Sequence, residues 1–225
     1  MNKTISIFLL IFIGALFAED CPLRGEDYDG VIYDEYGEIV LIDPMLYNAG
    51  ISRDDSAKAH INLIDMVRWY GYLSEDVLSA FVMTKGAIEV LFPEDSVGDR
   101  SDIKIITSES YGVCKIVADI LNANNISNEA PKNWIIEDSL SKSNYIYVII
   151  FERISTGEKV ELVWNYKEFL DLNHLSSSHF GTLKRKVLYG DAKSDEILKF
   201  RVLTNRMIKR VLRGEISPYR GHVIE

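Results

Sequence analysis

The chain has 225 residues, of which 47% are hydrophobic and 26% charged, and its formal net charge is −9. This composition is typical of a globular protein and excludes low-complexity and fibrous classes, while the excess of carboxylates disfavours nucleic acid as a ligand. The length suffices for one or two domains with a sizeable core, and no internal repeat of fixed period occurs.

The first 18 residues have the pattern of a secretory signal peptide. Lys3 precedes an uncharged, predominantly apolar run from Ile5 to Phe17, and cleavage is expected after Ala18. As a helix, the thirteen residues of this run rise about 20 Å, short of the roughly 30 Å of a hydrocarbon core. A buried N-terminal element and an uncleaved anchor are the alternatives. We therefore expect a secreted or periplasmic protein without an integral membrane segment after cleavage, and one α+β domain over 19–225 with a possible sub-boundary near 94–102.

Charge is distributed unevenly along the mature chain. Residues 19–102 contain 19 acidic and 6 basic side chains, whereas residues 182–225 contain 5 acidic and 11 basic ones. The two regions can attract each other within one fold. Alternatively, the acidic surface steers a cationic partner toward the protein, because surface potential acts on encounter rates.

The first elements are expected to be a β-hairpin and two helices. The run GVIYDEYGEIVLID, residues 30–43, has two β-rich segments around a turn at Gly37. Apolar residues at helical spacing predict a helix over 52–70 that ends at Gly71, and a second helix over 74–86. The two helices would pack as an αα-hairpin. The run AIEVLFP that follows is expected to form a short strand.

The middle of the chain predicts a strand, a helix and a long hairpin. The run IKIIT reads as a strand, and Ser108 or Ser110 is expected to cap the helix that carries Cys114. The run over 145–165 is the strongest hairpin signal in the sequence. Its first strand is apolar on both faces, as in the centre of a sheet, its second alternates, and the turn lies at 155–158.

The C-terminal region predicts two helices. The last begins near Ser194, ends at Gly214, and carries an apolar stripe opposite a basic face. We expect the stripe to pack on the protein's own sheet; binding of the basic face to a membrane surface is the alternative. Helices and antiparallel hairpins occur in separate runs, so the predicted fold class is α+β: antiparallel β-hairpins forming a sheet packed against an αα-hairpin and a C-terminal amphipathic helix.

Common catalytic and metal-binding motifs are absent from the sequence, including the P-loop, the nucleophile elbow, H-E-x-x-H and C-x-x-C. His174 and His179 lie near Asp171, but their spacing matches no common ligand pattern, so a surface or hydrogen-bonded pair is expected rather than a metal site. His60 is placed on a helix and His222 in a frayed tail. We expect no cofactor.

Cys114 lies in the first turn of its predicted helix, where the helix dipole favours a thiolate. The stretch YGVCKIVADILNANN resembles the nucleophile helix of transglutaminase-like cysteine enzymes, in which Gly-x-Cys begins a helix. The resemblance implies a histidine at the start of a following strand and an acid on the next. Here that strand begins at Asn144 without a histidine, and the next lacks the acid beside Trp164; His174 or His179 would have to substitute. A papain- or transglutaminase-like cysteine enzyme, or a degenerate relative, is therefore an alternative function.

Cys114 has two further possible roles. An exported chain with two cysteines has one intramolecular pairing, Cys21–Cys114, which we expect to form. It would close a loop of about 93 residues and, on the chain-entropy model, stabilise the fold by roughly 4–5 kcal/mol. Alternatively, Cys114 shares a helical face with Val117 and Leu121 and serves only in core packing.

The predicted function is binding rather than catalysis. The stretch EDYDGVIYDEYGE places Tyr28, Tyr33 and Tyr36 among carboxylates that include Asp34 and Glu35, a mixture that suits a patch facing a cationic protein partner. The same tyrosines could instead cover the sheet. We interpret the chain as a secreted or periplasmic binding or inhibitory protein, for example a toxin-neutralising protein of the immunity type. A cell-envelope structural protein, whose basic C-terminal helix contacts lipid, is a further alternative.

Overall fold

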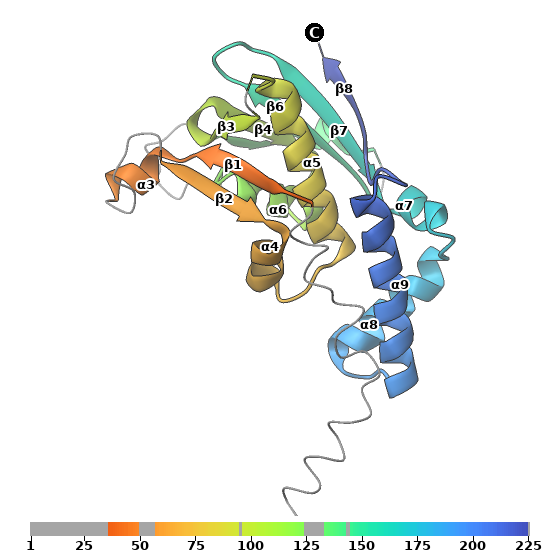
Figure 1. Ribbon diagram of the computed structural model, residues 1–225. Helices are drawn as coiled ribbons and strands as arrows, with labels where there is room; N and C mark the ends of the chain where they lie inside the picture. Colours follow the sequence, from red (N-terminus) through yellow and green to blue (C-terminus); the bar gives the residue numbers. More distant parts are fainter. Residues whose placement is uncertain (1–35, 50–56, 95, 124–132, 143–144, 225) are drawn as a thin grey trace, which may run out of the picture.

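The computed structural model describes residues 36–49, 57–94, 96–123, 133–142 and 145–224. Within them the chain forms two sheets, helices that cover these sheets, and further helices that pack on other helices (Figure 1). The α+β fold class predicted from the sequence is confirmed.

The first sheet has three strands, β2 (Lys58–Asn62), β1 (Glu38–Ile42) and β3 (Val97–Asp99), in that order. β1 pairs antiparallel with β2 and parallel with β3, and the short helix α3 (Pro44–Asn48) follows β1. Gly37 has φ +78°, as its predicted turn requires. The first strand of that predicted hairpin lies outside the described residues.

The second sheet has five strands, in the order β5 (Trp134–Ile136), β4 (Ile103–Thr107), β6 (Ile146–Arg153), β7 (Lys159–Asn165) and β8 (Arg220–Ile224). β4 and β5 are parallel, and the other neighbours are antiparallel. The predicted hairpin over 145–165 is confirmed, with β6 in the middle of the sheet. His222 does not lie in a frayed tail as predicted, because β8 pairs with β7 and satisfies its backbone groups.

Helix α5 (Glu75–Leu91) is the centre of the molecule. It contacts strands of both sheets, and also α4 (Leu63–Tyr70), α6 (Gly112–Ile120) and α9 (Ser194–Leu212) (Figure 1). Twelve of its 17 residues are buried, which is the pattern of a helix enclosed on all sides. Its neighbours in the core include Phe151, Leu162 and Trp164 of the second sheet.

The opposite face of the second sheet is mixed, with aliphatic residues such as Val148 and Ile150 next to charged ones. Residues that alternate with the core-facing ones form ion pairs there, such as Lys104–Glu152 at 3.0 Å. Alternation along β6 and β7 therefore separates a core face, covered by α5 and α6, from a face that carries both aliphatic and charged residues.

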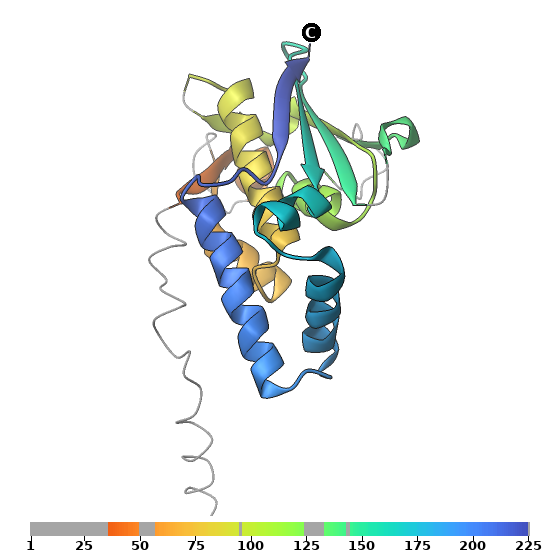
Figure 2. The same cartoon turned by 90° about the vertical axis from the view of Figure 1, so that its right-hand side faces the viewer.

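Three helices, not the predicted two, follow β7: α7 (Tyr166–Leu172), α8 (Ser177–Tyr189) and α9. α8 and α9 lie side by side and extend beyond the sheets (Figure 2). The predicted start of α9 near Ser194 and its end at Gly214, which has φ +69°, are confirmed. α9 packs mainly on α8 and α5 rather than on a sheet, because α5 already covers the sheet face.

The predicted helix over 52–70 is wrong in its described first part. Residues 58–62 form β2, and α4 begins only at Leu63. Pairing with β1 competes successfully with the helical periodicity, and Asn62 then caps the helix by accepting a hydrogen bond from the Asp65 N–H at 2.9 Å. The predicted stop at Gly71 is confirmed, and the expected αα-hairpin forms between α4 and α5.

The predicted strand AIEVLFP is also wrong, because α5 continues through Gly86 to Leu91. Gly86 does not end the helix; it makes room for a side chain from the far end of the sequence. A Cβ atom at Gly86 would lie 2.3 Å from Oη of Tyr219. The glycine lowers the local helix propensity but permits this close approach.

The predicted signal peptide (residues 1–18), Cys21 and most of the predicted partner patch lie outside the described residues. Within the described part of the chain, no helix is long and apolar enough to cross a membrane. The polar stretch 94–102 contains β3 and the short 3-10 helix η1 (Arg100–Asp102).

Candidate functional site

The predicted partner patch comprised Tyr28, Tyr33, Asp34, Glu35 and Tyr36, and only Tyr36 belongs to the described residues. Its side chain is half-buried, and its ring lies 6.1 Å from that of Phe81 in α5. Burial, together with Tyr219 and Glu89, raises the pKa of Tyr36 to about 12. Tyr36 therefore packs against the core.

Cys114 is completely buried at the start of α6. Burial raises the pKa of its thiol to about 12, with Ser108 and Glu109 as the nearest polar influences. A nucleophilic cysteine needs an accessible thiolate, so this environment opposes the chemistry that the helix start alone would favour. Cys21 lies outside the described residues, and the expected disulfide stays a prediction.

The start of α6 differs from the sequence prediction. The N-cap is Tyr111, without a side-chain cap, rather than Ser108 or Ser110. Ser108 instead accepts a hydrogen bond from the Val148 N–H at 3.1 Å. The helix begins at Gly112, whose φ of +57° suits glycine and where a Cβ would lie 3.3 Å from the Tyr147 ring. The glycine thus brings α6 close to an aromatic side chain of β6.

The histidines do not converge on the cysteine. His174 lies in the turn between α7 and α8, and His179 lies in α8. His60, predicted on a helix, lies on β2, with Nδ1 2.8 Å from a Glu38 carboxylate oxygen. Within the described part of the chain, no group of three or more His, Cys, Asp or Glu residues could hold a metal ion.

A continuous row of five aromatic side chains lies at the end of the second sheet; we call Tyr111, Tyr147, Trp164, Tyr166 and Tyr145 the aromatic row. Successive ring centroids are 6.2, 5.4, 5.6 and 5.9 Å apart, within the range of favourable aromatic pairs. The row comes from the start of α6, the β6–β7 hairpin and the start of α7. Trp164 is buried, whereas the terminal residues Tyr111 and Tyr145 are 57% and 62% exposed.

Glu75, the first residue of α5, contacts the aromatic row through Tyr166. Its side chain is buried, and Oε1 accepts hydrogen bonds from the Tyr166 hydroxyl at 3.0 Å and from Nζ of Lys184 at 2.6 Å. Burial acts to lower the pKa of Lys184, but the Glu75 and Asp76 carboxylates outweigh it and raise that pKa. Lys184 therefore stays charged and compensates Glu75.

Asp76 is the second carboxylate of the site. Its pKa is raised to about 6, first by burial and then by the neighbouring Glu75, while Lys184 acts in the opposite direction. Within the described residues Asp76 makes no hydrogen bond or ion pair, yet it is partly exposed. Burial raises the pKa values of Tyr147 and Tyr166 most, and the Asp76 charge raises both further, together with Glu75 in the case of Tyr166. A partly desolvated carboxylate that forms no direct ion pair with a described residue favours the approach of a cation.

Two buried polar atoms of the site lack partners in the described part of the chain: Oε2 of Glu75 and Nε1 of Trp164. Most buried polar atoms in folded proteins are hydrogen-bonded, so an acceptor and a donor left unpaired at one site have spare capacity for a ligand. Strongly perturbed carboxyl groups also gather at functional sites. These features make the aromatic row, with Glu75, Asp76 and Lys184, the candidate functional site.

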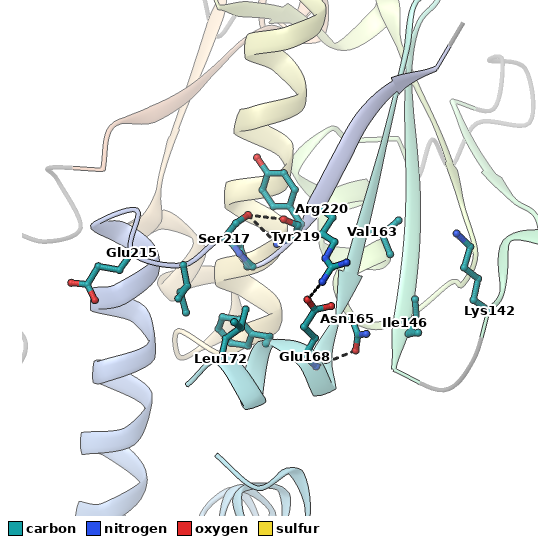
Figure 3. A pocket seen from close by; sticks show the side chains of 13 residues that line it. Lys142, Ile146, Val163, Asn165, Glu168, Leu172, Glu215, Ser217, Tyr219 and Arg220 are labelled. Carbon is teal, nitrogen blue, oxygen red and sulfur yellow. Dashed lines mark hydrogen bonds and ion pairs between the residues drawn. The ribbon is translucent and has the colours of Figure 1, made fainter. Parts of the chain in front are cut away.

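A hollow of about 500 Å³ opens on the opposite side of the same strand ends (Figure 3). Ile146, Val163 and Phe169 form its apolar part, and Glu168 pairs with Arg220 at its edge. This pair is exposed on the Arg220 side, so it contributes little stability. The polar groups labelled in the hollow pair largely with one another, so it is a weaker candidate than the aromatic row (Figure 3).

Sequence reasoning missed this site. Tyr145, Tyr147 and Trp164 appeared only as residues of the hairpin run, Tyr111 only as part of the stretch at the start of the Cys114 helix, and Glu75 and Asp76 only as the residues that follow the Ser74 cap. Tyr145 itself has φ +73°. The sequence does not predict this backbone conformation, because a bulky residue rarely adopts it. The one available signal was the high density of tyrosine and tryptophan in the hairpin run 145–166.

Comparison with protein-family models, with curated proteins and with solved structures finds no match to this chain.

Proposed function

We propose that this chain is an exported binding protein that recognises a cationic segment of a partner protein through the aromatic row and Asp76. The observation that carries the proposal is the combination of two exposed tyrosines at the ends of the row, Tyr111 and Tyr145, with the partly exposed Asp76 carboxylate, which forms no ion pair within the described residues. An inhibitory role, such as neutralising a basic toxin, is the setting that this surface and the predicted signal peptide suit best.

The chemistry of the site fits a lysine or arginine side chain. Cations bind the faces of tyrosine rings within about 6 Å, and tyrosine is enriched among the residues that dominate binding energy at interfaces. Asp76 supplies the negative charge, and Glu109 adds another carboxylate beside Tyr111, whose pKa it raises. The aromatic row is held by ring contacts across several elements, so a ligand would meet a preorganised surface.

The structure lends the cysteine-enzyme alternative no support. Cys114 is completely buried with a raised thiol pKa, and its polar neighbours are Ser108 and Glu109 rather than a histidine. We retain the prediction of an acidic, tyrosine-rich binding surface, but we propose different residues for it. Tyr36 packs on Phe81, whereas Tyr111 and Tyr145 are open to solvent.

Calorimetric titration with a tetra-arginine peptide tests the proposal, with a tetra-glutamate peptide as the charge control. Tetra-arginine is expected to bind and tetra-glutamate is not. Tyr145→Ala should weaken tetra-arginine binding at least fivefold, because it removes an exposed ring of the row. Tyr189→Ala is the matched control, since Tyr189 is an exposed tyrosine of α8 outside the row.

The same titration at 0.5 M salt should show weaker binding, because exposed charges are screened. Equal loss of affinity in the Tyr145→Ala and Tyr189→Ala variants would show that the aromatic row is not part of the binding surface. Failure of tetra-arginine to bind at low salt, in protein that melts cooperatively, would contradict the cationic character of the partner.

A further inference from the structure

Another hollow, of about 560 Å³, lies where α4, α8 and α9 meet. Its volume falls within the roughly 300–1,000 Å³ typical of small-molecule sites. None of the five residues of the aromatic row lines it, so it is a separate candidate site. Most of the side chains that line it are aliphatic or aromatic, and they come from all three helices: Ile64, Val67, Val187, Leu188, Ile197, Phe200 and Ile208.

One face of α9 forms much of this wall. Ile197, Phe200, Thr204 and Ile208 follow one another at intervals of three and four residues, so they share a face of the helix. Phe200 and Ile208 are buried, whereas Leu188 of α8, which also lines the hollow, is 49% exposed. The hollow therefore has a buried base on α9 and reaches the protein surface beside Leu188.

Thr204 places a hydroxyl in the middle of this otherwise apolar face. The residue is 8% exposed, and its Oγ1 makes no hydrogen bond within the described part of the chain. Most buried polar atoms in folded proteins have a hydrogen-bond partner, so this oxygen has spare capacity for a ligand. A threonine hydroxyl both donates and accepts, and a hydroxyl group of a ligand can match it in either direction.

The other polar residues of the wall are Tyr72, Arg201 and Asn205. Burial raises the pKa of Tyr72, so its hydroxyl is uncharged, and this hydroxyl also interacts with Ser74. Arg201 and Asn205 each have an interaction of their own in the protein, so Thr204 is the group to which a ligand's polar group is matched. Transfer of a charged group into apolar surroundings costs far more free energy than transfer of a hydroxyl, so this wall favours a neutral ligand.

We infer that this hollow binds a neutral apolar molecule with one hydroxyl group, such as a medium-chain alcohol. The alkyl chain lies against the apolar residues of α4, α8 and α9, and the hydroxyl forms a hydrogen bond with Oγ1 of Thr204. The ligand thus buries apolar surface and gives a partner to a buried oxygen. The site is independent of the proposed partner surface, because it shares no residue with the aromatic row.

Calorimetry with short-chain amphiphiles in monomeric solution tests the inference on the full chain. n-Octanol should bind, and both octanoate and n-octylammonium should bind at least tenfold more weakly because they carry a charge. n-Hexanol should bind at least fivefold more weakly than n-octanol, since each buried methylene changes affinity roughly fourfold.

Thr204→Val tests the hydrogen bond, because valine keeps the shape of threonine and removes the hydroxyl. The variant should bind n-octanol about fivefold more weakly, which corresponds to one net hydrogen bond. It should bind naphthalene, a neutral ligand without a hydrogen-bonding group, as tightly as the wild type does. Thr204→Ser is the matched control, because it keeps the hydroxyl and should retain the preference for n-octanol over naphthalene.

Two tryptophan substitutions locate the binding. Val67→Trp fills the hollow and should lower n-octanol affinity at least tenfold. Leu188→Trp at the exposed edge of the hollow replaces Val67→Trp if the latter does not melt cooperatively. Leu198→Trp is the matched control, because Leu198 is a partly exposed α9 residue outside the hollow.

Absence of n-octanol binding to protein that melts cooperatively would overturn the inference. Binding of n-octanol that Val67→Trp and Leu188→Trp leave unchanged would overturn it as well, because the ligand would then lie elsewhere. Tighter binding of octanoate or n-octylammonium than of n-octanol would contradict the neutral character of the ligand. Unchanged n-octanol affinity in Thr204→Val would show that Thr204 does not recognise the hydroxyl.

Discussion

The Nζ atom of Lys184 lies 2.6 Å from Oε1 of Glu75, and this contact joins α8 to the first residue of α5 across 109 positions of the sequence. The Glu75 side chain is 1% exposed and that of Lys184 is 19% exposed. Tyr166 shares the same carboxylate oxygen, at 3.0 Å, so the pair also supports the aromatic row. The C-terminal helices are thus tied electrostatically to the candidate site.

Replacement of Lys184 by methionine should destabilise the protein by about 3 kcal/mol, because it leaves the Glu75 carboxylate buried without a counter-charge. Urea unfolding measures this change. Lys186→Met is the matched control on the same helix, since the Lys186 side chain is 45% exposed and its pair with Glu196 should contribute at most about 1 kcal/mol. Equal losses in the two variants would contradict the special position of Lys184.

Asp76→Asn should make the protein more stable at pH 7.5. The pKa of Asp76 is raised from 3.8 to about 6, so between these values the folded state binds more protons than the unfolded chain. Stability therefore falls as pH rises through this window, and the destabilisation is complete above the folded pKa. Asparagine cannot ionise, so the variant should gain on the order of 1–3 kcal/mol at pH 7.5 and nothing at pH 3.5.

Urea unfolding at pH 7.5 and pH 3.5 measures the difference in unfolding free energy between wild type and Asp76→Asn. Groups other than Asp76 titrate in both proteins, so their contributions cancel in this difference. Asp138→Asn, at an exposed position of the 3-10 helix η2 (Asp138–Leu140), controls for loss of a carboxylate as such. A stability difference between wild type and Asp76→Asn that does not depend on pH would show that Asp76 is not desolvated in the folded protein.

Gly86→Ala should destabilise the protein, although alanine in a helix interior ordinarily stabilises by about 1 kcal/mol. The added Cβ would lie 2.3 Å from Tyr219 Oη and so displace the segment that leads into β8. Gly181→Ala in α8 is the matched control, because no atom lies within 4 Å of a Cβ there, and it should stabilise. Thermal melting measures whether each substitution raises or lowers the stability of the protein.

The additional substitution Tyr219→Phe should restore part of the stability lost in Gly86→Ala, because it removes the clashing hydroxyl. Stabilisation by Gly86→Ala alone would mean that Tyr219 does not pack against α5 in solution.

Thiol titration of the exported protein in denaturant, without reductant, tests the predicted Cys21–Cys114 disulfide. The disulfide predicts no reactive thiol before reduction and two after it. In a Cys21→Ser variant, Cys114 should react slowly while the protein is folded, because its thiol is buried and its pKa is raised to about 12. Two reactive thiols in the unreduced protein would contradict the disulfide.

Local patterns predicted a large part of the fold. The β6–β7 hairpin, α6 and α9 follow from alternation, helical periodicity and turn glycines such as Gly214, which act over short stretches of chain. Errors arose where a distant partner decides the conformation. Residues 58–62 become a strand because β1 pairs with them, and α5 continues past Gly86 because Tyr219 packs there.

Local sequence patterns could not predict the candidate site for the same reason. It combines residues of α5, α6, the β6–β7 hairpin, α7 and α8, and only the topology brings these segments together. Lys184 reads in the sequence as an ordinary surface lysine of a helix, and Asp76 as a first-turn acid. Their burial, which gives them their electrostatic character, is a property of the tertiary structure.

The affinity of tetra-arginine for the wild-type protein and for Asp76→Asn, measured at pH 7.5 and pH 5.0, tests the central claim most directly. Binding requires the ionised carboxylate, whose pKa is about 6 in the unbound protein, so wild-type affinity should fall at least fivefold at pH 5.0. Asp76→Asn should bind weakly at pH 7.5 and lose less affinity on acidification, which attributes the pH dependence of binding to Asp76. Wild-type affinity that stays constant between the two pH values, or an Asp76→Asn variant that binds as tightly as wild type, would contradict the account.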